Sequence, residues 1–108
     1  MKIDRNNKPI SIDFDGVLHK CSKGYQNGEI YDEPTEGAAW TCHNLAKKFT
    51  LIVMTARPKK EHKMVEEWLD KHGFPKMLVT NKKYNSRAYI DDRAIRFTAW
   101  HDVVKYFL

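Results

Sequence analysis

The sequence predicts a single α/β domain built on a mainly parallel β-sheet. Short apolar runs alternate with segments of helical periodicity along the 108 residues, and this alternation is typical of parallel strands joined by helices. The most strand-like run, TLIVMT at residues 50–55, is almost wholly apolar, as expected of a strand buried on both faces. No repeat or linker divides the chain, so we expect one domain over residues 1–108.

Each expected element rests on apolar spacing together with turn and cap residues. The predicted strands lie at residues 9–14, 50–55, 76–80 and 88–91, with a short fifth at 95–97. The predicted helices lie at about residues 35–49, 59–71 and 99–107. Aromatic side chains of these segments are expected to pack in or around the core: Phe49, Trp68, Trp100 and Phe107.

Cap and turn residues set the expected ends of these elements. Thr35 and Thr98 are predicted N-caps, and Gly73 is a predicted C-terminal cap. Residues 17–33 are polar and contain two Gly-bearing dipeptides, so we expect a loop there with tight turns at Lys23-Gly24 and Asn27-Gly28.

Composition and charge exclude several classes of protein. No apolar run approaches the roughly 18 residues of a membrane span, and the first ten residues lack the apolar stretch of a secretory signal. We therefore expect a cytoplasmic protein. Two cysteines form no CxxC pair and five histidines are scattered, so a zinc site is not expected. The net charge of +5 would attract phosphate-bearing partners, nucleic acid included, although the spread of the lysines favours a general solubility role.

Polar side chains of four kinds follow the predicted strands. They are Asp13 and Asp15, Thr55, Lys82 and Lys83, and the pair Asp91 and Asp92. Ligands bind at the carboxyl ends of parallel strands, so we expect these groups to converge at one edge of the sheet.

The chemistry of this set suits a phosphoryl group. Close carboxylate pairs repel by about 4 kcal/mol each at an effective dielectric near 20, so a cation is needed. Mg²⁺ prefers such oxygen ligands and binds carboxylates together with substrate phosphate. An aspartate can form an aspartyl-phosphate, and a second acid two residues along, Asp15, can protonate the leaving oxygen and later activate water. Gly16 leaves room for the loop that follows.

The motifs resemble those of the haloacid dehalogenase superfamily of phosphohydrolases. The first family motif is similar to residues 12–17, IDFDGV, and the second to residues 52–57, IVMTAR. The third is a lysine, here Lys82 or Lys83. The fourth is similar to residues 89–92, YIDD. The resemblance extends from about residue 9 to the C-terminus and implies a Rossmann-like three-layer α/β/α sandwich, Mg²⁺ as cofactor, and hydrolysis of phosphate monoesters through an aspartyl-phosphate.

The resemblance also implies a role for each motif residue. Asp13 would be the nucleophile and a metal ligand, and Asp15 the general acid/base, with its backbone carbonyl on the metal. Asp92 would ligate the metal directly, with Asp91 orienting the lysine or a metal-bound water. Thr55 would bind the phosphoryl group. Lys83 is preferred over Lys82 because the family lysine often lies about eight positions before the acidic pair. The substrate-binding set would comprise Gly16, Thr55, Ala56, Arg57, Lys82 and Lys83. Arg57 and Arg93 lie beside motif residues, and each could equally form a structural ion pair.

Many members of this family carry a large cap domain, and this chain has no room for one. Residues 17–34 are too few for a helical cap, so the site is expected to be open unless a partner or second subunit covers it. Expected partners are a phosphorylated small molecule or macromolecule, with a nucleic-acid phosphate end as a further candidate and no membrane. The loop containing His19, Lys20, Lys23 and Tyr25 is a candidate for substrate contact.

The alternative to an enzyme is a non-catalytic module of the same fold that binds a phosphorylated ligand or a nucleic-acid end. A phosphate-accepting receiver domain is disfavoured, because its acidic pair precedes the acceptor aspartate, whereas Asp91 and Asp92 come last. A nuclease built on a DxD pair is disfavoured too, because it would need a glutamate at an earlier strand end and none precedes Asp13.

Overall fold

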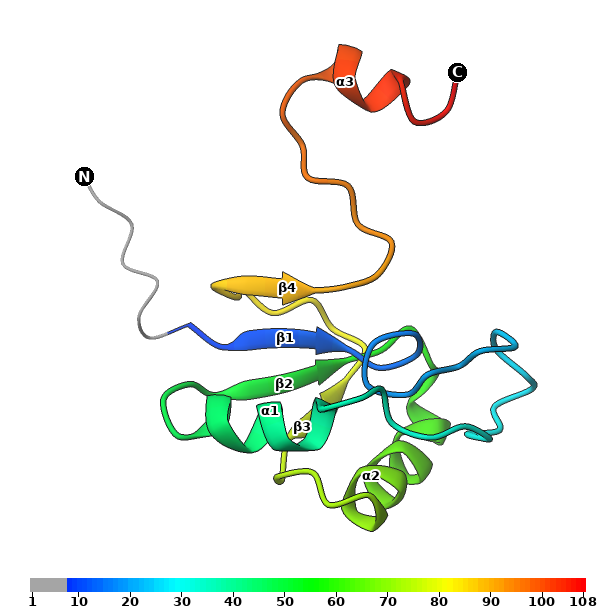
Figure 1. Cartoon of the computed structure of the whole chain (residues 1–108), viewed down its shortest axis with the longest axis vertical. Coiled ribbons are helices and arrows are strands. Elements are labelled where there is room, and N and C mark those ends of the chain that lie inside the picture. The colour runs from blue at the N-terminus through cyan, green and yellow to red at the C-terminus, as the bar shows by residue number, and fades with distance from the viewer. Residues whose placement is uncertain (1–7) are drawn as a thin grey trace.

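The computed structural model describes residues 8–108 and shows a small α/β protein with an all-parallel four-stranded sheet and three α-helices (Figure 1). The strands are β1 (Ile10–Asp13), β2 (Leu51–Met54), β3 (Leu78–Thr80) and β4 (Ala88–Ile90). The helices are α1 (Ala38–Ala46), α2 (His62–Lys71), which follows a 3₁₀ turn η1 (Lys59–Glu61), and α3 (Trp100–Val104).

The sheet order is β3-β2-β1-β4, which places β1 between β2 and β4. Residue pairs in register include Asp13 with Met54, and Ile12 with Ile90. Because all four strands are parallel, the residues that follow β2, β3 and β4 lie at the same edge as the end of β1. The expected parallel sheet is thus confirmed.

Both α1 and α2 pack on one face of this sheet. The β1-α1-β2 and β2-α2-β3 units step in the same direction across the sheet, and right-handed crossovers then place both helices on the same side. Apolar residues of alternate strand positions join helix residues in one buried cluster: Ile10, Ile12, Phe14, Leu51, Val53, Cys42, Val65, Trp68 and Leu69. Burial of about 1.5–3 kcal/mol per large apolar side chain makes this cluster the main stabilising element.

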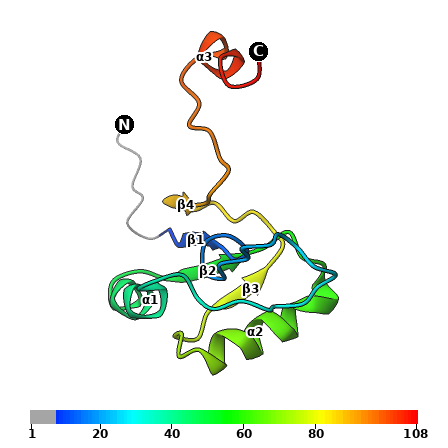
Figure 2. The same cartoon turned by 45° about the vertical axis from the view of Figure 1, so that its right-hand side comes forward.

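The opposite face of the sheet has no comparable helical layer within residues 8–108. β3 and β4 are joined by only residues 81–87, which contain no helix, and Ser86 reaches Ser11 of β1 through a side-chain hydrogen bond of 2.5 Å. Helix α3 stands away from the sheet at the end of an extended segment (Figure 2). The α/β class is shown, whereas the expected three-layer sandwich is not confirmed.

Several expected boundaries and caps are wrong. α1 begins after Gly37, not at Thr35, because the Thr35 hydroxyl donates to the Val17 carbonyl in the preceding loop. Thr98 does not cap α3; its hydroxyl bonds to the Asp102 carboxylate, and Ala99 holds the N-cap position. The expected strand at residues 95–97 is absent from the part of the chain that is described, because no neighbouring strand pairs with it.

The expected packing of the C-terminal aromatic residues is also wrong. Trp100 is 73% exposed and Phe107 is 72% exposed, whereas Trp68 is buried and Phe49 packs against the core. Trp100 begins α3 and Phe107 follows it, and this part of the chain stands away from the sheet (Figure 1), so neither side chain reaches the core.

The turn predictions are confirmed. Asn27 and Gly28 both have positive φ, 51° and 89°, and Glu29 donates its backbone N–H to the Gln26 carbonyl at 2.9 Å, as in a tight two-residue turn. Gly24 closes a turn onto Cys21, and Gly73 follows α2 with φ of 77°. No helix in residues 8–108 is long and apolar enough to cross a membrane.

Candidate functional site

Residues far apart in the sequence meet at the carboxyl edge of the sheet. β1 ends at Asp13, and Asp91 and Asp92 follow β4 directly. One carboxylate oxygen from each of these three residues lies within 4.8 Å of the others. We call Asp13, Asp91 and Asp92 the acidic cluster. The central position of β1 explains the meeting, because Ile12 pairs with Ile90 and the next residues, Asp13 and Asp91, continue that register.

The acidic cluster needs a counter-charge. Burial raises the pKa of Asp13 from 3.8 to about 6, and repulsion from Asp91 and Asp92 adds to this rise, while the Phe14 backbone N–H, bonded to Asp13 at 2.8 Å, opposes it. The described residues place no ion pair on these carboxylates. A hard divalent cation with oxygen ligands is the group that such a donor set fits.

Gly16 shows that the close approach of Asp92 is built into the backbone. A Cβ on Gly16 would lie 2.4 Å from Asp92 Oδ2, and the φ of Gly16 is +86°, a conformation that side chains disfavour. Only glycine therefore lets the loop after β1 lie against the Asp92 carboxylate. Asp13, Asp91 and Asp92 are thus the residues that could hold a divalent cation at this edge.

Asp15 lies two residues from Asp13 in a different environment. Arg57 holds both of its oxygens, with Nε 2.8 Å from Oδ2 and an NH2 nitrogen 3.0 Å from Oδ1. His19 Nδ1 lies 2.9 Å from Oδ1. Burial by itself raises the pKa of Asp15, but the hydrogen bonds from Arg57 and His19 outweigh it and hold the pKa below 3.8. The Asp15 carboxylate is therefore ionised and faces Arg57, not the acidic cluster.

His19 acts as a structural residue. It is fully buried, and its ring packs against Phe14, Trp68 and Tyr31. Its Nε2 accepts the Asp32 backbone N–H at 3.1 Å, which leaves Nδ1 as the protonated nitrogen that donates to Asp15. Both ring nitrogens are thus occupied. This geometry disfavours the substrate contact for which His19 was a candidate.

The same bonds argue against a metal in a second group of potential ligands, Asp15, His19 and Cys21, which also lie within 4.8 Å of one another. A metal there would need the His19 nitrogen and the Asp15 oxygens that Arg57 and the loop already use. The Cys21 thiol is only partly buried and its pKa is raised, first by burial, so the thiolate that a metal requires is disfavoured.

Arg57 is the centre of a buried network. It is only 3% exposed, and its NH1 donates to the Gly28 carbonyl at 2.7 Å and to Glu61 Oε1 at 3.0 Å. Tyr25 closes the network by donating its hydroxyl to Glu61 at 2.7 Å while its ring lies over the guanidinium. The guanidinium expected to bind substrate is therefore occupied by Asp15, Glu61 and the 17–33 loop. Ala56, beside it, is exposed.

Glu61 and Gly28 are members of this network that the sequence reasoning missed. The spacing of Arg57 and Glu61, four residues apart around the start of a helix, is a signal that favours an ion pair. Nothing in the sequence marks the carbonyl of Gly28 as a partner of Arg57.

Thr55 and the two lysines complete the edge. Thr55 is 3% exposed, and its hydroxyl oxygen accepts the Arg57 backbone N–H at 3.1 Å, which fixes the hydroxyl near the end of β2. Lys82 donates its backbone N–H to Thr80, and its side chain is exposed. Lys83 Nζ lies 5.0 Å from the ring centroid of Tyr89, two residues before Asp91 on β4.

Lys83 thus contacts the strand that leads into the acidic cluster, since Tyr89 lies on β4 and Asp91 is the first residue after it. No ion pair joins either lysine to that cluster among the residues that are described.

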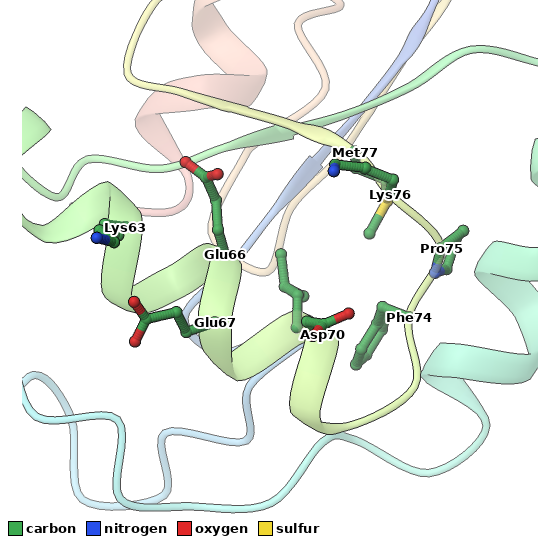
Figure 3. A pocket seen from close by; sticks show the side chains of 9 residues that line it. Lys63, Glu66, Glu67, Asp70, Phe74, Pro75, Lys76 and Met77 are labelled. Atoms are coloured by element: carbon green, nitrogen blue, oxygen red, sulfur yellow. The ribbon is translucent and has the colours of Figure 1, made fainter.

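A groove of about 340 Å³ lies elsewhere, between α2 and the segment that leads into β3 (Figure 3). Its charged side chains have both signs: Lys63, Glu66, Glu67, Asp70 and Lys76. It shares no residue with the acidic cluster or with the Arg57 network, and its mixed charge offers no preference for an anion.

Comparison of the whole chain with protein-family models, with curated proteins and with solved structures finds no match in any of the three. The site is therefore interpreted from its own geometry.

Proposed function

We propose that this chain is a Mg²⁺-dependent phosphohydrolase that cleaves phosphate monoesters through an aspartyl-phosphate on Asp13. The haloacid dehalogenase superfamily, with its Rossmann-like three-layer sandwich, is the family to which we propose that it belongs, on the motifs around Asp13, Thr55 and Asp91. The natural substrate is a phosphorylated small molecule or macromolecule.

The observation that carries the proposal is the meeting of Asp13, Asp91 and Asp92 within 4.8 Å, with Gly16 shaped to receive Asp92. Repulsion among three carboxylates at one sheet edge favours a bound cation, which a role in folding alone would not call for. Burial raises the pKa of Asp13 to about 6, with a smaller contribution from Asp91 and Asp92, and a perturbed carboxyl at a sheet edge is typical of a functional site.

In the proposed reaction, an Asp13 carboxylate oxygen attacks phosphorus in line with the leaving oxygen. The bond from phosphorus to the leaving oxygen breaks, and the phosphoryl group remains on Asp13. Mg²⁺, held by Asp13, Asp92 and Asp91, would supply positive charge to the phosphoryl oxygens and to the nucleophile. Thr55 would donate its hydroxyl to a phosphoryl oxygen, and Lys83 would swing from Tyr89 to neutralise a second one.

Water then hydrolyses the aspartyl-phosphate, with Asp15 as the base. The ionised state that Arg57 and His19 impose on Asp15 suits this second step, because a base must be free of its proton. Protonation of the leaving oxygen in the first step requires Asp15 to turn away from Arg57. Without those hydrogen bonds burial alone acts on Asp15, and its pKa rises.

The test is turnover of p-nitrophenyl phosphate with and without Mg²⁺, for the wild type and for Asp13→Asn. We expect Mg²⁺-dependent release of phosphate by the wild type and a loss of at least about 10³-fold in Asp13→Asn, which lacks the nucleophile. Equal rates for both proteins would refute the role of Asp13.

One observation favours a second candidate, a non-catalytic module that binds a phosphorylated ligand or a nucleic-acid phosphate end. Asp15 is held by Arg57 in a buried ion pair, a geometry that a purely structural residue would also adopt. A wild type without turnover that binds a phosphorylated oligonucleotide or metabolite in the presence of Mg²⁺ would support the module.

A further inference from the structure

The C-terminal residues 94–108, which we call the arm, expose an unusual share of apolar surface. Both views show the arm extending away from the sheet (Figures 1 and 2). Its exposed large apolar side chains are Ile95, Phe97, Trp100, Val104, Tyr106, Phe107 and Leu108. Seven such residues among fifteen form a surface of the kind that marks an interaction site in a soluble protein.

The hydrogen bonds that the structure describes for the arm lie within the arm itself. Among residues 8–86 and 88–93, no hydrogen bond or ion pair reaches the arm, and its bonds are internal, such as Thr98 to Asp102. Phe97 packs edge-on against Trp100 with ring centroids 5.2 Å apart. The arm is thus locally ordered, while its large apolar side chains remain exposed in the described part of the chain.

The sheet offers a matching surface at β4. Ala88 and Ile90 are in register with Ile10 and Ile12, whose side chains lie in the core, so they belong to the apolar face that α1 and α2 cover. That cover stops before β4: Ala88 is exposed and Ile90 is 42% exposed. The outer edge of β4 also has no neighbouring strand in the described sheet, and an unpaired edge is a template for strand addition.

The connection within one chain is too short for its own arm to extend the parallel sheet. Only residues 91–94 separate the end of β4 from Ile95, whereas a parallel crossover needs about a dozen residues or more. An antiparallel return would have to reverse the chain at Asp91 and Asp92, which are held against Asp13 and Gly16. A second copy is free of both restrictions.

We propose that two copies of this chain exchange their arms, each arm packing its apolar residues on the exposed β4 of the other copy. Ile95 and Phe97, two residues apart, lie on one side of an extended segment and meet the Ala88–Ile90 face, while Trp100 and α3 extend the cover beyond it. Exchange of an identical element between protomers is a low-cost route to a symmetric dimer.

The test is the molar mass of the full-length protein, measured by light scattering and by sedimentation at several concentrations. We expect a wild-type dimer, and a monomer for Trp100→Glu in the arm and for Ile90→Glu in the receiving face. Trp40→Glu is the matched control, since Trp40 on α1 is exposed to the same 73% as Trp100, and it should remain dimeric. Circular dichroism verifies folding, and Ala88→Glu replaces Ile90→Glu if that variant unfolds.

Mixing the two monomeric variants separates exchange from other contacts. In an exchanged dimer of Trp100→Glu with Ile90→Glu, one of the two arm–face contacts is intact, so a heterodimer should form. A monomeric wild type at every concentration would overturn the proposal and indicate closure on the chain's own sheet or a different partner. A dimer that Ile90→Glu leaves intact would overturn it too, in favour of arm-to-arm packing.

Discussion

Replacing Gly16 with alanine tests whether the acidic cluster is built for function. The new Cβ would lie 2.4 Å from Asp92 Oδ2, and ordinary contact begins at about 3.4 Å, so the carboxylate must move by about 1 Å. Asp92 is a surface side chain and can swing away at low cost. Metal ligands tolerate about 0.2 Å, so this displacement removes Asp92 from the proposed cation site. A misplacement of this size costs about 100-fold in turnover.

Gly73→Ala is a matched control for the strain in the backbone. Gly73 has φ of +77°, close to the +86° of Gly16, but a Cβ there meets nothing within 4 Å. Both variants should lose about 1–2 kcal/mol of unfolding free energy from the left-handed conformation. Only Gly16→Ala should lose Mg²⁺ affinity, by tenfold or more in calorimetric titration, together with turnover of p-nitrophenyl phosphate. Equal Mg²⁺ affinity in the two variants would refute the assigned role of Asp92.

Three further predictions concern Arg57, Asp13 and the lysines. Arg57→Met should lose about 3 kcal/mol of unfolding free energy in urea, because it leaves the charges of Asp15 and Glu61 without their cation. Arg93→Met at the exposed surface should lose almost nothing, and an equally small loss for Arg57→Met would contradict the network. The pKa of Asp13 is about 6 in the metal-free folded protein and 3.8 in the unfolded chain. Between about pH 4 and 6, Asp13 is therefore protonated in the folded protein and ionised in the unfolded chain. The stability that this proton contributes is complete below about pH 4 and is lost as the pH rises through about 6. The unfolding free energy of metal-free Asp13→Asn should therefore increase relative to that of the wild type over this range. A difference in unfolding free energy that is independent of pH would argue against the raised pKa. Lys83→Met should lower turnover more than Lys82→Met, and the reverse order would assign the site lysine to Lys82.

The sheet could be predicted from the sequence because its signals are local. Each parallel strand is a short apolar run that ends at a turn residue, and buried strands need little more than that to be recognised. The convergence of Asp13 with Asp91 then follows from parallel topology alone. The Asn27-Gly28 turn was predictable for the same reason, since both residues tolerate positive φ.

What could not be predicted depends on partners distant in the sequence. The sequence left Arg57 open to a substrate contact or to a structural ion pair. Its charge is balanced by Asp15, Glu61 and the Gly28 carbonyl, contacts that only the folded loop creates. Trp100 was expected in or around the core because large aromatic side chains are usually buried, yet that tendency does not say which surface buries them, and Trp100 is 73% exposed.

Asp13 and Asp15 are two residues apart, and their environments move their pKa values in opposite directions. The proposed first step requires Asp13, the nucleophile, to be ionised and Asp15, the acid, to be protonated. In the metal-free protein the order of the two pKa values is the reverse, because Asp13 holds a proton more readily than Asp15. A cation at the acidic cluster lowers the pKa of Asp13, and release from Arg57 raises that of Asp15. The two changes are separate, since Arg57 makes no contact with Asp13, Asp91 or Asp92 among the described bonds. Metal binding should therefore ionise Asp13 without changing the two hydrogen bonds from Arg57 to Asp15. Turnover of substrates whose leaving group needs no proton should depend least on those hydrogen bonds.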